Sequence, residues 1–477
     1  MLTYDVEIWN IRTRKDRRKP HMLRWRVGAK EHSKSYLTKA QAEGRQTELR
    51  AALRKREQFD TESGLPGSEL LALNSPTWYD HSRAYVLMKW PKIAAKHRAS
   101  IAESLAAITP VLVTSAKGAP TPKLLRYALS AWAFRMVRNE QGELTSLADV
   151  TPPPADVATA LAWLKQNSMK VEEAARPANL RRALDALSLK LNGQPASDNT
   201  VKRKRAVLSN CLRYAVERDH LPTHPLSKVD WEPPQTDDEI DFRYVPGPRQ
   251  AKVLIEAVRT QGDRGEHLEA FFGCIYYAGM RPSEIAALKR KDCVLPDEQD
   301  GSAPSWGELI LEESRPEVGA GWTDDGVSYE QRGLKRRARR ATRSVPIPPI
   351  LVRLLRAHLS AQGTAPDGRL FRAVRGGRVR STEYCEVWAQ ARRKALTADE
   401  ANTPLAEVPY SLRHAGISLW LKAGVDPVEV ARRAGHSLAV LYRFYAKILR
   451  GQSDSNHLID AVLNEANDET KARFSTS

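Results

Sequence analysis

Residues 275–285 read Ile-Tyr-Tyr-Ala-Gly-Met-Arg-Pro-Ser-Glu-Ile, and this order predicts a junction between two helices. Gly279 suits the end of the first helix, because glycine readily adopts the left-handed backbone found there. Pro282 suits the start of the second, where its missing N–H is not needed. Arg281 is therefore expected at a helix N-terminus, which favours a phosphate oxygen. Glu284 can orient its guanidinium; the alternative is an Arg–Glu pair on a surface turn.

A basic run lies further along, in residues 333–347, Gly-Leu-Lys-Arg-Arg-Ala-Arg-Arg-Ala-Thr-Arg-Ser-Val-Pro-Ile. Arginine keeps its proton near neutral pH, whereas lysine can release one. Lys335 is therefore the cation of this run that suits a proton donor. The alternative is a turn that only binds phosphate.

Two later segments carry further candidates. Residues 409–417, Pro-Tyr-Ser-Leu-Arg-His-Ala-Gly-Ile, place Arg413 at a predicted helix start, where it suits a second phosphate contact. Residues 434–437, Ala-Gly-His-Ser, place His436 after a glycine helix stop, and Tyr445 follows nine residues later. A lone His or Tyr in such a place is more often structural than catalytic, so only the whole set points to a function.

In chain order, the set is Arg281, Lys335, Arg413, His436 and Tyr445. It resembles the signature of the tyrosine recombinases, the phage integrase family. Gly-Met-Arg-Pro-Ser-Glu-Ile is similar to the family's first arginine motif, Leu-Arg-His to its second and Gly-His-Ser to its third. The family places its nucleophile nine residues after that histidine, a spacing that Tyr445 meets and Tyr442 does not.

The resemblance implies a site-specific recombinase that cuts and rejoins DNA to integrate or excise a phage or mobile element. Tyr445 would attack the phosphate to give a 3′-phosphotyrosyl link, and Lys335 would protonate the departing 5′-oxygen. The other three residues would neutralise the phosphate, with no metal or cofactor. The implied partner is double-stranded DNA, bound by a homotetramer with accessory DNA-bending or directionality factors.

One position departs from the family pattern. The second motif commonly begins with His or Lys three residues before its arginine, as a general base, but here that position is Tyr410. A phenol, with an ordinary pKa near ~10, is a poor base at neutral pH. Proton removal from Tyr445 then falls to His436 or to His414, and the resemblance does not choose between them.

Composition supports a nucleic-acid partner. The chain has 477 residues, 42% of them hydrophobic, which suffices for several domain cores and excludes a disordered tail. Its net charge of +18 favours a polyanion, with nucleic acid ahead of an anionic membrane. No apolar run is long enough to span a membrane and the start lacks a signal peptide, so we expect a cytoplasmic protein. The four cysteines are widely spaced, which predicts reduced thiols.

The predicted fold class is multidomain α+β, with small sheets in a mainly helical chain. The expected parts are a basic arm-type DNA-binding domain over 1–62, a helical core-binding domain over 75–230, a linker over 231–248, a catalytic domain of tyrosine recombinase fold over 249–465 and a tail over 466–477.

The first part is expected to hold three short strands near 4–8, 23–27 and 33–37, then a helix that Thr38 and Gln41 cap. Residues 62–68 resemble a linker.

Within the helical part, Asp198-Asn199-Thr200 predicts a helix start, followed by a basic quartet over 202–205. In the last part, the pattern predicts a hairpin-like region over 308–347 and helices near 249–260, 267–278, 350–361, 381–396, 411–423 and 427–434. A further helix over 447–463 is predicted to dock on a neighbouring subunit or on its own domain.

Residues 12–19 carry six positive charges, and Trp25 lies between two arginines on the next predicted strand. A small sheet with such a basic edge can lie in a DNA groove. The alternative is a solvated loop.

Two rival functions stay open. A type IB topoisomerase-like enzyme shares the tyrosine chemistry, but the separate basic N-terminal part favours recombination. A DNA-binding protein of recombinase descent without catalysis is suggested by Tyr410, whereas retention of both arginines, the lysine and Tyr445 argues against it.

Overall fold

The computed structural model describes the chain except residues 15, 191, 233, 235–239, 298–304, 335–340 and 452–477. Lys335, the tail over 466–477 and most of the helix predicted over 447–463 therefore lie outside the described residues. The chain divides into two compact units, Met1–Gln235 and Thr236–Ser477, and the division falls inside the predicted linker. Helices predominate and the sheets are small, as the predicted α+β class requires.

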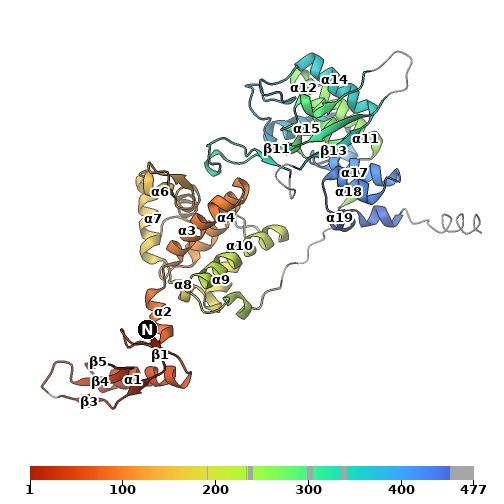
Figure 1. Ribbon diagram of the computed structural model, residues 1–477. Helices are drawn as coiled ribbons and strands as arrows, with labels where there is room; N and C mark the ends of the chain where they lie inside the picture. The colour runs from red at the N-terminus through yellow and green to blue at the C-terminus, as the bar shows by residue number, and fades with distance from the viewer. Residues whose placement is uncertain are drawn as a thin grey trace, which may run out of the picture. The chain divides into compact units, whose positions relative to one another are not determined.

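The N-terminal sheet contains the three predicted strands, β2 (Val6–Ile8), β4 (His21–Val27) and β5 (Lys30–Tyr36), and also the two-residue β3 (Arg12–Thr13). Its order is β2-β4-β3, with β5 also paired to β4, and all pairs are antiparallel. A separate ladder joins β1 (Leu2–Thr3) to β6 (Phe59–Asp60). Helix α1 (Lys39–Arg54) begins at the predicted capping box of Thr38 and Gln41 and lies against the sheet (Figure 1).

Strand β4 alternates between a buried and a polar face. Its apolar residues Leu23, Trp25 and Val27 form the core of this part with Leu49, Ala52 and Phe59. Trp25 is therefore a core residue, and its indole N–H donates a 2.7 Å hydrogen bond to the carbonyl oxygen of Gly64. Residues 62–68, predicted as a linker, are thus tied to the sheet, and α2 begins within them.

The rest of the first unit is helical, apart from the hairpin of β7 (Met136–Arg138) and β8 (Leu144–Ser146). Its helices are α2 (Gly67–Asn74), α3 (Trp78–Lys89), α4 (Ala95–Ile108), α5 (Pro122–Tyr127), α6 (Leu147–Val150), α7 (Ala155–Asn167), α8 (Val171–Ala174), α9 (Pro177–Leu187) and α10 (Asp198–Glu217). The last is the predicted helix, but its N-cap is Ser197, one residue before the predicted cluster.

In the second unit, a small antiparallel sheet has the order β13-β10-β9. Its strands are β9 (Cys293–Val294), β10 (Gly307–Leu311) and β13 (Arg343–Ile347), and β11 (Glu313–Ser314) pairs with β12 (Arg332–Gly333) beside it. Strands β10 to β13 make up the predicted hairpin-like region, whereas β9 lies before it.

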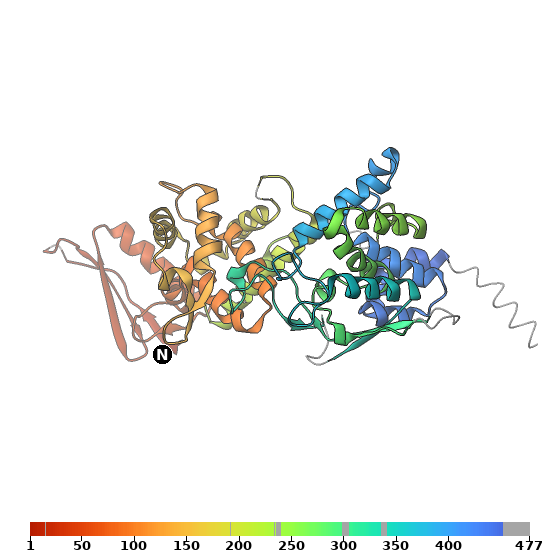
Figure 2. The same ribbon diagram turned by 90° about the horizontal axis from the view of Figure 1, so that it is seen from above.

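The six helices predicted between residues 249 and 434 are all present, with α12 beginning five residues before its predicted start. The helices are α11 (Pro248–Arg259), α12 (Gly262–Tyr277), α13 (Pro282–Ile285), α14 (Pro349–Gln362), α15 (Ser381–Ala395), α16 (Ala398–Ala401), α17 (Ser411–Lys422), α18 (Pro427–Ala434) and α19 (Leu438–Gly451). The last three, coloured blue, lie together in both views (Figures 1 and 2). One continuous apolar core joins α11, α12, α14, α15 and α17 to the sheet.

The four cysteines are free thiols, as predicted, and Cys385 is the exposed one. Among the residues that the structure describes, no helix is long and apolar enough to cross a membrane.

Candidate active site

Four of the five predicted site residues converge in the second unit from separate segments. Arg281 is the N-cap of α13, Arg413 lies in the first turn of α17, His436 follows α18 and Tyr445 lies within α19. A 3.0 Å contact joins Arg413 Nη2 to His436 Nε2. Arg281 is close enough to both His436 and Tyr445 for its charge to add to the burial that lowers the pKa of His436 and to oppose the burial that raises the pKa of Tyr445. Lys335, the fifth, is outside the described residues.

Arg281 is held as the sequence predicts. Helix α12 ends at Tyr277, Gly279 adopts a φ of +54° and Pro282 opens α13. Glu284 accepts from the backbone N–H of Arg281 at 2.9 Å and from its Nη1 at 3.0 Å. The two groups are therefore not a surface pair: Glu284 is only 2% exposed.

Arg343 is the residue of this cluster that the sequence analysis did not single out. Its Nη1 and Nη2 donate to the two carboxylate oxygens of Glu284 at 3.1 and 2.7 Å. Burial alone would raise the pKa of Glu284, but Arg343 first and then Arg281 hold it at about 2. The period-two alternation of residues 343–347 could have predicted the burial of Arg343, because Arg343 shares the buried face of β13 with Val345 and Ile347.

Gly435 brings these groups close together. It ends α18 in the left-handed conformation, with φ +63°. Its carbonyl oxygen accepts from Arg281 Nη2 at 3.0 Å. A Cβ at this position would lie 2.1 Å from Arg343 Nη1, so both the backbone conformation and the space require glycine. The turn sets His436, the next residue, beside Arg413.

Arg413 is fully buried. Its Nη2 donates to the carbonyl oxygen of Ala434 as well as contacting His436, whereas its Nε and Nη1 have no hydrogen-bond partner in the described part of the chain. Burial lowers the pKa of Arg413, because a charge is costly away from water. Unpaired donors on a buried guanidinium are the arrangement expected where an anion binds.

His436 is neutral at physiological pH. Burial, then the charge of Arg413 and then that of Arg281, lowers its pKa to about 3. A guanidinium only donates hydrogen bonds, so Nε2 of His436 must be the acceptor in its contact with Arg413. The single proton of the ring is then on Nδ1, which is buried without a partner among the described residues.

Tyr445 is also fully buried, at a break in α19 where its backbone is non-helical (φ −118°, ψ 17°). Its hydroxyl lies 3.0 Å from Nδ1 of His414. Burial raises the pKa of Tyr445, although Arg413 opposes this. Tyr410 packs edge-on against the ring of His414, with ring centroids 5.2 Å apart.

The described part of this cluster carries more positive than negative charge. Three guanidinium groups, those of Arg281, Arg343 and Arg413, surround the single carboxylate of Glu284, which leaves a surplus of two positive charges. A buried surplus of this kind requires an anionic partner. A phosphodiester carries one negative charge, and a second develops in the transition state when a nucleophile attacks it. Among the described residues, no group of His, Cys, Asp or Glu forms a metal site.

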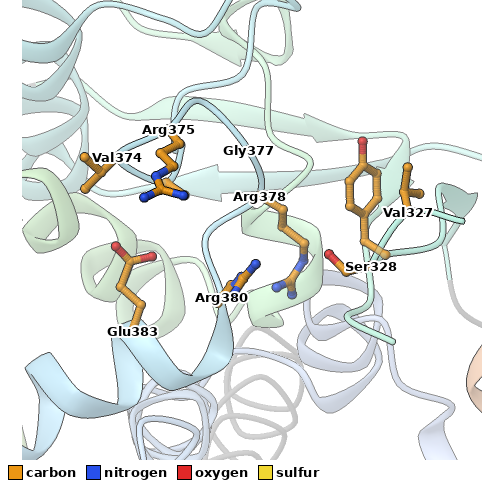
Figure 3. A pocket seen from close by; sticks show the side chains of 10 residues that line it. Val327, Ser328, Val374, Arg375, Gly377, Arg378, Arg380 and Glu383 are labelled. Atoms are coloured by element: carbon orange, nitrogen blue, oxygen red, sulfur yellow. The ribbon is translucent and has the colours of Figure 1, made fainter. Parts of the chain in front are cut away.

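A cleft of about 580 Å³ lies elsewhere in this unit, between the loop at Val327–Tyr329 and the loop before α15. Figure 3 shows Arg375, Arg378 and Arg380 along its wall. The guanidinium of Arg378 is tied down by the carbonyl of Arg315 and by the carboxylate of Glu317. The cleft has none of the cluster residues in its lining and was not predicted.

The two basic runs of the first unit differ in exposure. Arg17, Arg18 and Lys19 are exposed in the loop between β3 and β4. In contrast, Lys204 of the predicted basic quartet is only 4% exposed and pairs with Glu103.

The exposed face of α10 is also basic. Arg205 stacks on Trp231, with its Cζ 4.1 Å from the ring centroid, and both line a hollow of about 380 Å³ with Lys202 and Arg213. A guanidinium stacked on a half-buried aromatic ring beside further cations is typical of nucleic-acid surfaces.

Comparison with solved structures finds recombinases. The chain is similar to the Tn1549 transposon integrase in complex with transposon right end DNA, with 15% identity over 66% of this chain and 96% of that one and a TM-score of 0.45. It is similar to the XerH site-specific recombinase bound to a palindromic difH substrate, with 12% identity, 76% and 96% coverage and a TM-score of 0.41. A lambda integrase dimer bound to a core site matches 91% of this chain and 94% of its own, with 14% identity and a TM-score of 0.43.

No protein-family model and no curated protein sequence matches the chain.

Proposed function

We propose that the chain is a tyrosine-type site-specific recombinase, an enzyme that breaks and rejoins DNA strands through a covalent phosphotyrosyl intermediate to integrate or excise a mobile element. The observation that carries the proposal is the fully buried Arg413, with two unpaired donor atoms, in one cluster with Arg281, His436 and a buried tyrosine. This combination neutralises a phosphodiester and offers it a nucleophile.

The roles follow from the donor sets. Arg281, Arg413 and the Nδ1–H of His436 hold the non-bridging oxygens of the scissile phosphate. Glu284 orients Arg281 by accepting a hydrogen bond from its guanidinium, and Arg343 holds Glu284 in place. Tyr445 attacks phosphorus, the 5′-oxygen of the next nucleotide leaves, and attack by another strand's 5′-hydroxyl reverses the step. Lys335 is proposed as the donor to the leaving oxygen, on the strength of the sequence motif alone.

The remaining parts have binding roles in this proposal. Residues 1–62 bind arm-type DNA sites, residues 75–230 bind the core site with the basic face of α10, and residues 249–465 carry the chemistry. The proposed assembly is a homotetramer on paired double-stranded sites in the cytoplasm, assisted by accessory factors. A type IB topoisomerase-like enzyme would act as a monomer, so the mass of the protein–DNA complex separates the two functions.

Covalent trapping tests the proposal. Nicked duplexes tiled across the DNA that flanks the coding gene are incubated with the full chain and run on a denaturing gel. A slow, protease-sensitive band is expected with the native chain. Tyr445→Phe is expected to reduce it by at least ~10⁴-fold with DNA binding retained, because the nucleophile is lost.

Tyr442→Phe is the matched control, since Tyr442 is 50% exposed and lies three residues earlier on the same helix. An active Tyr445→Phe chain would contradict the proposal. Tight binding without any adduct from the native chain would favour the catalysis-free DNA-binding protein instead.

A further inference from the structure

The hydroxyl of Tyr445 has one hydrogen-bond partner among the described residues, His414. The two atoms, Oη and Nδ1, lie 3.0 Å apart although their residues are 31 positions apart in sequence. Because Tyr445 is fully buried, its hydroxyl proton needs an acceptor from the protein. The arrangement that satisfies this proton is Oη–H donating to the free lone pair of Nδ1.

His436, the other histidine of the cluster, has no free lone pair to offer. Its Nε2 lone pair faces Arg413, and its Nδ1 carries the proton. The two histidines therefore present opposite functions to the site. His436 presents a donor, which suits a phosphate oxygen, and His414 presents an acceptor, which suits the nucleophile.

Tyr410 is the residue at the position where the resemblance leads one to expect a base. The ring of Tyr410 packs edge-on against the ring of His414. The guanidinium of Arg413 lies over the ring of Tyr410, with Cζ 6.0 Å from the ring centroid. A phenol accepts a proton poorly at neutral pH. Tyr410 therefore positions His414 and Arg413 and does not itself act as the base.

We propose that His414 is the general base of this enzyme, taking the proton from Tyr445 as the tyrosine attacks phosphorus. The inference rests on the proposed recombinase function. In the step, the Oη–H bond breaks and an N–H bond forms at Nδ1, while the Oη–P bond forms and the bond from phosphorus to the 5′-oxygen breaks. The 5′-oxygen takes a proton from the leaving-group donor, assigned above to Lys335. On reversal, His414 returns its proton to the departing Tyr445.

The surroundings of His414 keep it ready to accept. Burial first, and the charge of Arg413 second, lower the pKa of His414 to about 4, so the ring is neutral at pH 7. The other titratable groups that face it are Tyr410 on its own helix, Tyr445 on α19 and His436 after α18. A bound phosphodiester offsets the charge of Arg413, and so removes one of the two causes that disfavour the imidazolium.

An acidic nucleophile tests this role directly. His414→Asn in the full chain is expected to slow adduct formation on the nicked duplexes by about 10²-fold, the lower range for a general base. A fluorinated tyrosine installed at position 445 has a more acidic phenol than tyrosine in the same buried site, so its attack depends less on a base. It is expected to restore the rate of His414→Asn to within about tenfold of the native chain, and to flatten the dependence of the rate on pH.

His436→Ala is the control, because it removes a phosphate donor and that loss is not repaired by a more acidic phenol. DNA affinity and thermal midpoint, measured for each variant, show whether the chain is folded. A folded His414→Asn chain that cleaves at the native rate overturns the inference, and so does a defect that fluorotyrosine leaves unchanged. If the native chain forms no adduct at all, it is the proposed function that fails.

Discussion

The arginines around Glu284 and those of the N-terminal sheet are equally basic side chains in opposite environments. Arg343 and Glu284 are each 2% exposed, so their ion pair is shielded from water. Arg24 and Glu31 form an ion pair across β4 and β5, but their side chains are 37% and 55% exposed. Water screens the second pair and not the first. The contrast teaches that a buried Arg–Glu pair fixes the positions of its side chains, whereas an exposed Arg–Glu pair contributes mainly to the surface charge.

The largest effect on folding is expected from Glu284→Gln. Removing the carboxylate leaves Arg343 buried without its partner, which costs about 3–5 kcal/mol of unfolding free energy. Chemical denaturation at pH 7 measures the loss.

The pH dependence of this variant sharpens the prediction. In the native chain the pKa of Glu284 is lowered from 4.5 to about 2, so its stabilising effect is complete above about pH 4.5 and is lost as the pH falls toward 2. The difference between Glu284→Gln and the native chain should therefore shrink over that interval. A difference below about 1 kcal/mol at pH 7 would break the comparison.

An intermediate effect is expected from the exposed loop cations. Replacing Arg17, Arg18 and Lys19 together with alanine removes up to three phosphate contacts. The slope of the logarithm of the DNA association constant against the logarithm of salt concentration should then become shallower by about 0.9 for each contact. Fluorescence titration of duplex DNA at several salt concentrations measures this slope, and the unfolding free energy should stay within about 0.5 kcal/mol. An unchanged slope would mean that the loop cations face solvent and do not contact the DNA.

The smallest effect is expected from Glu31→Gln, the counterpart of Glu284→Gln. It also removes a carboxylate from a guanidinium, but at an exposed pair that contributes about 0–1 kcal/mol. The same denaturation experiment measures it, and any loss should fade in high salt. A loss comparable with that of Glu284→Gln would mean that burial is not what distinguishes the two pairs.

The sequence by itself determined the local geometry. Gly279, Arg281 and Pro282 are neighbours, so helix termination and the placement of the guanidinium followed from backbone preferences alone. The capping box of Thr38 was readable for the same reason. The alternation of β13 also encoded the burial of Arg343, but a charged residue on a core face only makes sense once its partner is known.

The tertiary structure alone decided which distant groups meet. Trp25 stands between two arginines in the sequence, and only the structure shows that it packs in a core that α1 and Phe59 complete. His414 and His436 look alike in sequence, and the resemblance left the base undecided between them. Only the packing of α17 against α18 and α19 turns one ring toward Arg413 and the other toward Tyr445. Hydrogen-bond direction depends on the partner, and the partner comes from a different segment of the chain.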